Sequence, residues 1–286
     1  MDSTRAPSLA VDATTVLSNG VHMPLFGYGT SHNGGFSSDA LEFALQHGYR
    51  MVDTARRYGC ERQIGQVLLK HGCRERVWLT SKLWPGDYGR VEAACVESLR
   101  DLGVAHLDLF LMHWPEVPAT CSGGNADESR LLVWRAMESL YEKGLCRAIG
   151  VSNFLPHHLD GLLDGCSIRP HVNQVEFNPF QQPVRLLEHC RREGIHLQGY
   201  CPLAKAHVLD TPVVASIAER HGKTAAQCLI RYSLQKGVGA IPKSTKKSRV
   251  KENAHVFDFE LTSAEMGALD ALDCNLRVTW DPTYIP

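Results

Sequence analysis

Residues 148–200 read AIGVSNFLPHHLDGLLDGCSIRPHVNQVEFNPFQQPVRLLEHCRREGIHLQGY, and the pattern of these residues predicts the fold class. Short apolar runs of strand length lie at Ala148–Val151, Val172–Glu176 and His196–Tyr200. Helical patterns lie between them, at Leu155–Leu163 and Pro183–Glu193. Strands that alternate with helices in this way predict parallel βαβ units.

The same alternation continues on both sides of this stretch. The other predicted strands are Leu25–Gly29, Met51–Asp53, Val77–Ser81, Leu107–His113 and Gly239–Pro242. The other helical patterns are Ser37–His47, Glu61–His71, Tyr88–Leu102, Ser129–Lys143, Asp210–Arg220, Thr224–Leu234, one from Lys247, and Ser263–Leu272. Near the start, Ser18-Asn19-Gly20 between two short apolar runs predicts a β-hairpin.

Eight strands alternating with helices fit either a closed barrel or an open doubly wound sheet. An open sheet usually carries G-x-G-x-x-G after its first strand, but here Gly27 and Gly29 are followed by Ser31 and His32, and no helix begins there. We therefore predict an α/β fold, a (β/α)₈ TIM barrel with an N-terminal hairpin and extra helices near the C-terminus. Residues 1–286 are expected to form one domain, with residues 1–12 flexible, since such barrels take about 250 residues.

Composition excludes several function classes. The net charge of −1 disfavours nucleic acid and anionic membranes as partners. No run of about 18 apolar residues predicts a membrane span, and the opening residues lack the apolar segment of a secretory signal. The ten cysteines form no C-x-x-C pair or zinc-site spacing, so we expect no metal site, reduced thiols and a cytoplasmic protein.

Polar residues stand at the ends of several predicted strands, where barrel enzymes carry their catalytic groups. Asp53 ends the second strand and is followed by Tyr58, Lys82 follows the third, and His113 ends the fourth. Each residue alone has an ordinary structural explanation, such as a cap or an ion pair. Neighbouring barrel strands would bring all four side chains together, which favours a catalytic site.

The chain resembles the aldo-keto reductase superfamily from about Thr15 to Pro282. The matching stretches, in the order of that family, are VDTARRYGCE, TSKLW, LMHWP, IGVSNF, NQVEFNP and IPKSTKKSRVKEN. The resemblance implies reduction of an aldehyde or ketone with NADPH, and a catalytic tetrad of Asp53, Tyr58, Lys82 and His113. It also leads us to expect a monomer that acts on a small carbonyl compound.

Elementary chemistry assigns a role to each member of this tetrad. Hydride addition to a carbonyl leaves charge on oxygen, which needs a proton donor. We expect Tyr58 to be that acid, Lys82 to lower its pKa, Asp53 to hold Lys82, and His113 to orient the carbonyl. Two alternatives stay open: a Schiff-base lyase using Lys82, and a cofactor-binding regulatory relative with little turnover.

A basic cluster after the last strand predicts a phosphate site. Barrels often bind phosphate after strands seven and eight, and cations at a helix N-terminus are stabilised by a shared anion. The resemblance implies that Lys243, Ser244 and Arg249 hold the 2′-phosphate of NADPH and that Glu252 and Asn253 hold its adenine, with Thr245 also binding the cofactor. The remaining cofactor contacts implied by the resemblance are Thr30, Ser152, Asn153, Gln174, Tyr200, Cys201 and Leu203.

Aromatic residues define the expected substrate side of the site. Trp84 and Trp114, together with His113, are predicted to contact the substrate, and Trp280 either closes the site or packs on the barrel. Ser31 stands where vertebrate aldose reductase-like members often have tryptophan, and the tail after Trp280 is short. We therefore expect an open site that accepts varied small aldehydes, without the specificity of the steroid-reducing members.

Overall fold

The computed structural model describes residues 10–31, 34–118 and 125–286, and within them eight parallel strands form one sheet. Residues 1–9 of the segment expected to be flexible lie outside this description. The order of the strands in the sheet follows the chain. They are β3 (Tyr28–Gly29), β4 (Met51–Asp53), β5 (Trp78–Leu83), β6 (Leu109–Met112), β7 (Ile149–Ser152), β8 (Val172–Glu176), β9 (His196–Tyr200) and β10 (Gly239–Ala240).

The first and last strands of this sheet also meet, which closes it into a barrel. Phe26 and Ala240 form a parallel bridge, and the Gly27 amide donates to the Ala240 carbonyl at 3.0 Å. Farther along the same seam, a Cβ on Gly29 would lie only 2.8 Å from the backbone oxygen of Ile241, so this position requires glycine. Together with the parallel sheet, this seam confirms the predicted (β/α)₈ barrel.

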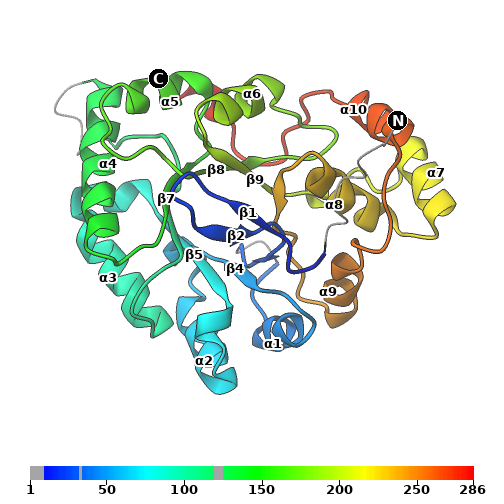
Figure 1. Ribbon diagram of the computed structural model, residues 1–286, viewed down its shortest axis with the longest axis horizontal. Helices are drawn as coiled ribbons and strands as arrows, with labels where there is room; N and C mark the ends of the chain where they lie inside the picture. Colours follow the sequence, from blue (N-terminus) through cyan, green and yellow to red (C-terminus); the bar gives the residue numbers. More distant parts are fainter. Residues whose placement is uncertain (1–9, 32–33, 119–124) are drawn as a thin grey trace.

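Helices surround the strands (Figure 1). The helices are α1 (Ser38–Gln46), α2 (Glu61–His71), α3 (Val91–Leu102), α4 (Ala126–Glu142), α5 (Pro156–Leu163), α6 (Val184–Arg192), α7 (Pro212–His221), α8 (Ala225–Gln235), α9 (Lys247–Ala254) and α10 (Ser263–Asp270). Two helices, α3 and α4, begin three residues away from their predicted starts. Asn125 caps α4 by accepting from the Glu128 amide, so the helix begins before Ser129, and a 3₁₀ helix over Pro85–Arg90 precedes α3.

The predicted hairpin, β1 (Thr14–Val16) and β2 (His22–Pro24), lies across the centre of the ring of helices in Figure 1. Its Leu17 and Met23 are buried in the same apolar cluster as Met51 and Trp78, which are the first residues of β4 and β5. The hairpin therefore closes the N-terminal end of the barrel and leaves the opposite end for the site.

The alternation of strand side chains positions polar groups inside the barrel. Met51, Leu111 and Val172 belong to the interior apolar cluster. Since successive side chains point to opposite faces, Asp53, His113 and Gln174, each two residues further on, face the same interior near the C-terminal end. The barrel therefore has an apolar layer beneath a polar one.

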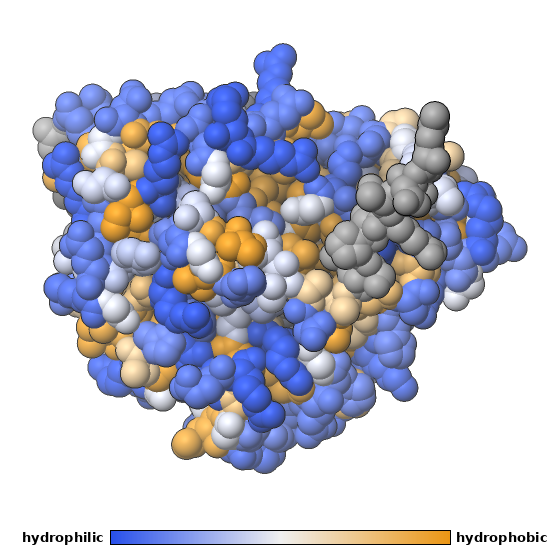
Figure 2. All heavy atoms as spheres, viewed as in Figure 1, coloured by the Kyte–Doolittle hydropathy of each residue, from blue (hydrophilic) through white to orange (hydrophobic). Residues whose placement is uncertain are grey.

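Across the described residues, the surface and the cysteines show no further feature that bears on the site. The face seen in Figure 2 is mostly hydrophilic, with hydrophobic residues in small groups. Among the described helices, none combines the length and the apolar character that a membrane crossing requires. The described cysteines are all free thiols, and most of them are buried.

Candidate active site

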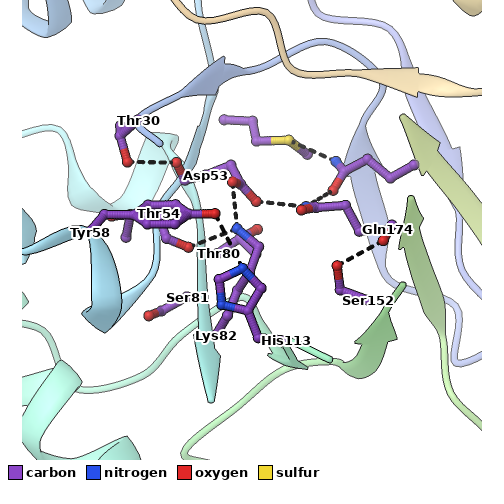
Figure 3. A network of polar contacts seen from close by, with 12 residues as sticks. Thr30, Asp53, Thr54, Tyr58, Thr80, Ser81, Lys82, His113, Ser152 and Gln174 are labelled. Carbon is purple, nitrogen blue, oxygen red and sulfur yellow. Dashed lines mark hydrogen bonds and ion pairs between the residues drawn. The ribbon is translucent and has the colours of Figure 1, made fainter. Parts of the chain in front are cut away.

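A buried ion pair lies at the centre of the polar layer (Figure 3). The Lys82 ammonium donates to Asp53 Oδ1 at 2.6 Å and to the Thr54 carbonyl at 2.9 Å. Lys82 is 1% exposed and Asp53 is 3% exposed, so neither charge is compensated by bulk water. A buried charge without a counterion would be strongly destabilising, so each of these two groups stabilises the other, and the contact holds the Lys82 side chain in one position.

Neighbouring strands hold the carboxylate of this pair. The amide nitrogen of Gln174 donates to Asp53 Oδ2 at 2.7 Å and lies 2.7 Å from Gln198 Oε1. Thr30 binds the Asp53 carbonyl through both its amide, at 3.0 Å, and its hydroxyl, at 2.9 Å. The position of the lysine therefore depends on residues from β4, β8, β9 and the end of β3.

Tyr58 reaches the same point from a short 3₁₀ helix, Arg56–Tyr58, that follows β4. Gly59 ends this helix with a φ of 72°, a conformation that glycine adopts at low cost. The Tyr58 hydroxyl lies 3.4 Å from His113 Nε2, and the Lys82 ammonium lies 5.2 Å from the centre of the Tyr58 ring. The structure thus brings all four residues of the predicted tetrad together (Figure 3).

The electrostatics of Tyr58 differ from the expectation for a tyrosine beside a lysine. Burial raises the pKa of Tyr58 well above its usual value, and the Asp53 carboxylate raises it further. Lys82 does not outweigh these effects because its charge is paired with Asp53 at 2.6 Å, while burial lowers its own pKa. Tyr58 is therefore a protonated phenol at neutral pH, which can donate a proton and a hydrogen bond.

A second group of polar residues lies at the C-terminal ends of β7, β8 and β9. Asn153 has a φ of 64°, and its amide nitrogen donates to the His113 carbonyl at 3.0 Å and the Ser152 hydroxyl at 3.1 Å. The Tyr200 hydroxyl donates to Asn153 Oδ1 at 2.7 Å, and Ser152 donates to the Gln174 carbonyl at 2.8 Å. The four residues expected to hold a nicotinamide ring thus form one connected cluster beside the tetrad.

The loop after β9 has an unusual backbone. Cys201, Ala204, Lys205 and Ala206 all have positive φ angles between 44° and 70°. Such angles are costly for residues other than glycine and are found most often at functional sites. Burial raises the pKa of the Cys201 thiol to about 12, so the thiol stays neutral. The loop that contains Cys201 and Leu203 could therefore present its backbone, but not a thiolate, to a ligand.

The start of α9 has the chemistry of an anion site. Lys246 caps this helix without a side-chain hydrogen bond, and the first turn has no acidic residue. Thr245, Lys246, Lys247 and Arg249 are exposed, so their polar groups and the helix N-terminus can share one bound anion. These residues fit the phosphate of a cofactor.

The other residues predicted around that phosphate are more constrained. The Ser244 hydroxyl accepts from the Lys246 amide at 3.1 Å, and the Lys243 ammonium lies 3.2 Å from where a Cβ on Gly34 would stand. Lys243 therefore reaches toward the loop after β3. Farther along, Glu252 accepts from the Thr224 hydroxyl at 2.7 Å and Asn253 is buried, so both are held by the helix packing.

Three tryptophans meet at the mouth of the site. The Trp280 ring lies 5.9 Å from the Trp84 ring and 5.8 Å from the Trp114 ring, and the Trp84 and His113 rings are perpendicular at 5.3 Å. Trp280 was expected either to close the site or to pack on the barrel, and in the structure it lies over the site. Trp280 remains 60% exposed, so this aromatic cover is open to solvent.

Two further residues at the site, Glu176 and Arg57, were not predicted from the sequence. The buried Glu176 carboxylate accepts from the amides of Val278, at 2.8 Å, and Thr279, at 3.1 Å, and so ties the C-terminal tail to β8. Its position, two residues after Gln174 on one strand face, was the available signal. Arg57, directly before Tyr58, stacks on Trp84 with its guanidinium carbon 4.0 Å from the ring centre, and no local pattern indicates that contact.

Comparison with known proteins agrees with this geometry. Residues 25–273 match the model of the aldo/keto reductase family. The chain is 44% identical over 282 residues to the uncharacterized oxidoreductase YtbE of Bacillus subtilis, covering 95% of this chain and 97% of the relative. It is 42% identical over 274 residues to the glyoxal reductase of Bacillus subtilis, covering 94% and 96%.

A solved structure shows the same architecture. The aldo-keto reductase of Bombyx mori in complex with NADP superposes with a TM-score of 0.88 at 30% identity, covering 97% of this chain and 100% of that chain. Within the described residues, no group of three or more His, Cys, Asp or Glu side chains is placed to hold a metal ion. The family model spans most of the chain, and the barrel and the site have the arrangement that its motifs predict, so the chain belongs to the aldo/keto reductase family.

Proposed function

We propose that this protein reduces small aldehydes or ketones to alcohols with NADPH. The observation that carries the proposal is the convergence of the Tyr58 hydroxyl, His113 Nε2 and the buried Lys82–Asp53 pair at the C-terminal end of the barrel. A bound reduced nicotinamide supplies the hydride. The protein must then bind the carbonyl, orient it and deliver one proton to its oxygen.

Tyr58 is the proton donor in this proposal. Its raised pKa keeps the phenol protonated until charge develops on the carbonyl oxygen. His113 Nε2, 3.4 Å from the Tyr58 oxygen, contributes the second hydrogen bond to that oxygen and orients the carbonyl. Lys82 stabilises the tyrosinate left after proton transfer, and Asp53 holds the lysine in place. General acid catalysis of this kind contributes roughly 10²–10⁴-fold in rate.

The NADPH preference rests on the basic start of α9. Arg249 and Lys243 would hold the 2′-phosphate with Ser244 and Thr245, since a guanidinium can bind phosphate with two parallel hydrogen bonds. The cluster of Ser152, Asn153, Gln174 and Tyr200 would hold the nicotinamide. The remaining predicted contacts are Thr30 beneath the cofactor, Cys201 and Leu203 at the pyrophosphate, and Glu252 and Asn253 at the adenine. The complex of the Bombyx mori relative with NADP supports this choice.

The deciding experiment follows the loss of NADPH absorbance with glyoxal and a panel of aromatic and short-chain aldehydes. Tyr58→Phe should lower kcat by roughly 10²-fold or more because it removes the acid and leaves the ring. The matched control is Tyr284→Phe, since that side chain is 88% exposed and lies outside the site. Unchanged turnover in Tyr58→Phe would refute the assignment of the acid.

The alternatives are outcomes of the same measurements. Tight NADPH binding without turnover of any aldehyde would favour the cofactor-binding regulatory function. A Schiff-base lyase would require a neutral Lys82 amine, whereas the structure pairs Lys82 with Asp53 at 2.6 Å. Trapping of a substrate on Lys82 by borohydride would support the lyase. Arg249→Ala should weaken NADPH binding by roughly tenfold, with little effect on NADH, because it removes a charged hydrogen bond.

A further inference from the structure

Arg57 has an unusual place at the mouth of the site. It belongs to the 3₁₀ helix Arg56–Tyr58 and directly precedes the proposed acid. Its guanidinium carbon lies 4.0 Å from the centre of the Trp84 ring and 5.9 Å from that of Trp280. The side chain is nevertheless exposed, so the charge is held by stacking at a point that solvent and ligands reach.

The charge of Arg57 has no counterion in the part of the chain that the structure describes. Nearby arginines do have one: Arg56 pairs with Glu97 at 2.6 Å, and Arg62 pairs with Asp101 at 3.2 Å. Arg57 makes neither an ion pair nor a hydrogen bond within residues 10–31, 34–118 and 125–286, only ring contacts. All five donors of its guanidinium are therefore available to an anion.

The stacking connects this charge to the reacting groups. One face of Trp84 carries the guanidinium, while Trp84 also meets His113 at a ring separation of 5.3 Å. A carbonyl held by Tyr58 and His113 would thus extend along Trp84 toward Arg57. An aldehyde with an anionic group opposite its carbonyl has the matching charge, and an aromatic ring suits the tryptophans at the mouth of the site.

We propose that Arg57 binds a carboxylate on the carbonyl substrate and that the protein therefore prefers oxo acids over neutral aldehydes of the same size. This proposal rests on the reductase function proposed above. A guanidinium recognises a carboxylate with two parallel hydrogen bonds, and stacking on Trp84 orients it for that contact. The reaction is unchanged: the carbonyl carbon gains a hydride and its oxygen gains a proton.

The kinetic test compares 4-formylbenzoate with its methyl ester, which has the same ring and aldehyde but no charge. The quantity measured is the ratio of their kcat/KM values within each variant. In the native protein the ratio should favour the carboxylate by roughly tenfold, as for one charged hydrogen-bond pair near the surface. Arg57→Met should abolish the preference, since methionine keeps an apolar stem against Trp84 and removes the charge.

Control variants separate this role from a general effect of charge. Arg62→Met removes an equal charge from an arginine that already has a carboxylate partner, and should leave the ratio unchanged. Arg57→Lys should give an intermediate ratio because it keeps the charge and loses the planar fork. Added salt should reduce the native preference, because an exposed pair is screened. An equal ratio in the native protein and Arg57→Met would overturn the proposal.

A binding measurement keeps the proposal testable without turnover. Calorimetric titration of the full chain with benzoate, and with benzamide as the neutral probe, both in the presence of NADP⁺, reports the carboxylate contact directly. Benzoate should bind roughly tenfold more weakly to Arg57→Met, with benzamide unchanged. Equal benzoate affinities would overturn the role of Arg57. If the benzoate difference is observed but neither aldehyde is reduced, the carboxylate site stands and the reductase function fails instead.

Discussion

Breaking the Lys82–Asp53 pair should destabilise the fold far more than its single contact suggests. The Asp53 carboxylate accepts from Lys82 on one oxygen, at 2.6 Å, and from Gln174 on the other, at 2.7 Å. In Asp53→Asn the side chain has one oxygen, so either Lys82 or Gln174 faces an amide NH₂ group. If Lys82 stays charged, it is a buried cation without its counterion.

The magnitude follows from this burial. Removing one partner of a buried ion pair costs about 3–5 kcal/mol. For a chain of this size, such a loss lowers the melting temperature by roughly 10 °C. Lys82→Met should cost a similar amount, because Asp53 then keeps its charge and only the Gln174 hydrogen bond and its backbone contacts.

The double variant distinguishes the pair from its surroundings. In Asp53→Asn with Lys82→Met both charges are gone, and the asparagine oxygen can accept from Gln174. The double variant should therefore lose about 1–3 kcal/mol less unfolding free energy than the two single variants lose together. The free energies are measured by chemical denaturation followed by circular dichroism. The control is the surface Lys70–Glu42 pair, at 2.8 Å, whose removal should cost far less because solvent screens the two charges. Additive losses, or single losses as small as that of the control pair, would show that the buried pair does not stabilise the fold in this way.

Three further predictions concern the mouth of the site, its backbone and its tail. Trp280→Ala should raise KM severalfold for aromatic but not short-chain aldehydes, because its exposed ring covers Trp84 and Trp114; equal changes for both classes would contradict this. Asn153→Ala should be less stable than Asn153→Gly by about 1 kcal/mol in denaturation, because φ is 64°; the reverse order would exclude strain. Burial lowers the pKa of His158 to about 4, whereas the ordinary pKa of histidine is about 6.5. Between these two pH values the folded state therefore binds fewer protons than the unfolded state. Stability should therefore fall as pH drops through this window, and His158→Gln should flatten the melting-temperature profile.

Most of the fold was predictable because its signals are local. The apolar runs that became β4, β8 and β9 match the predicted strands at both ends. Helix starts were harder to predict, since α4 begins at Ala126 under an asparagine cap inside a loop rich in glycine. The tetrad was predictable because Asp53, Lys82 and His113 stand at strand ends and Tyr58 follows Asp53 closely in the chain. Their closeness follows from barrel geometry.

The pKa of Tyr58 could not be predicted in this way. The sequence places Lys82 near the tyrosine and leads to the expectation of a lowered pKa. The direction is set by burial, which depends on all the segments around the ring, and by the Asp53 charge. Desolvation is a sum over the whole packed neighbourhood, and a strand-end motif carries only part of it.

Patterns in the chain were enough to predict the order of the strands and helices and to select Asp53, Tyr58, Lys82 and His113 as one set. These depend on periodicity and on the few residues beside each strand end. Three features depend on the folded chain: the Phe26–Ala240 seam, the tail contacts of Glu176, and the contacts of Arg57 with the rings of Trp84 and Trp280. Those contacts join segments far apart in the chain, and their geometry exists only once the barrel has closed.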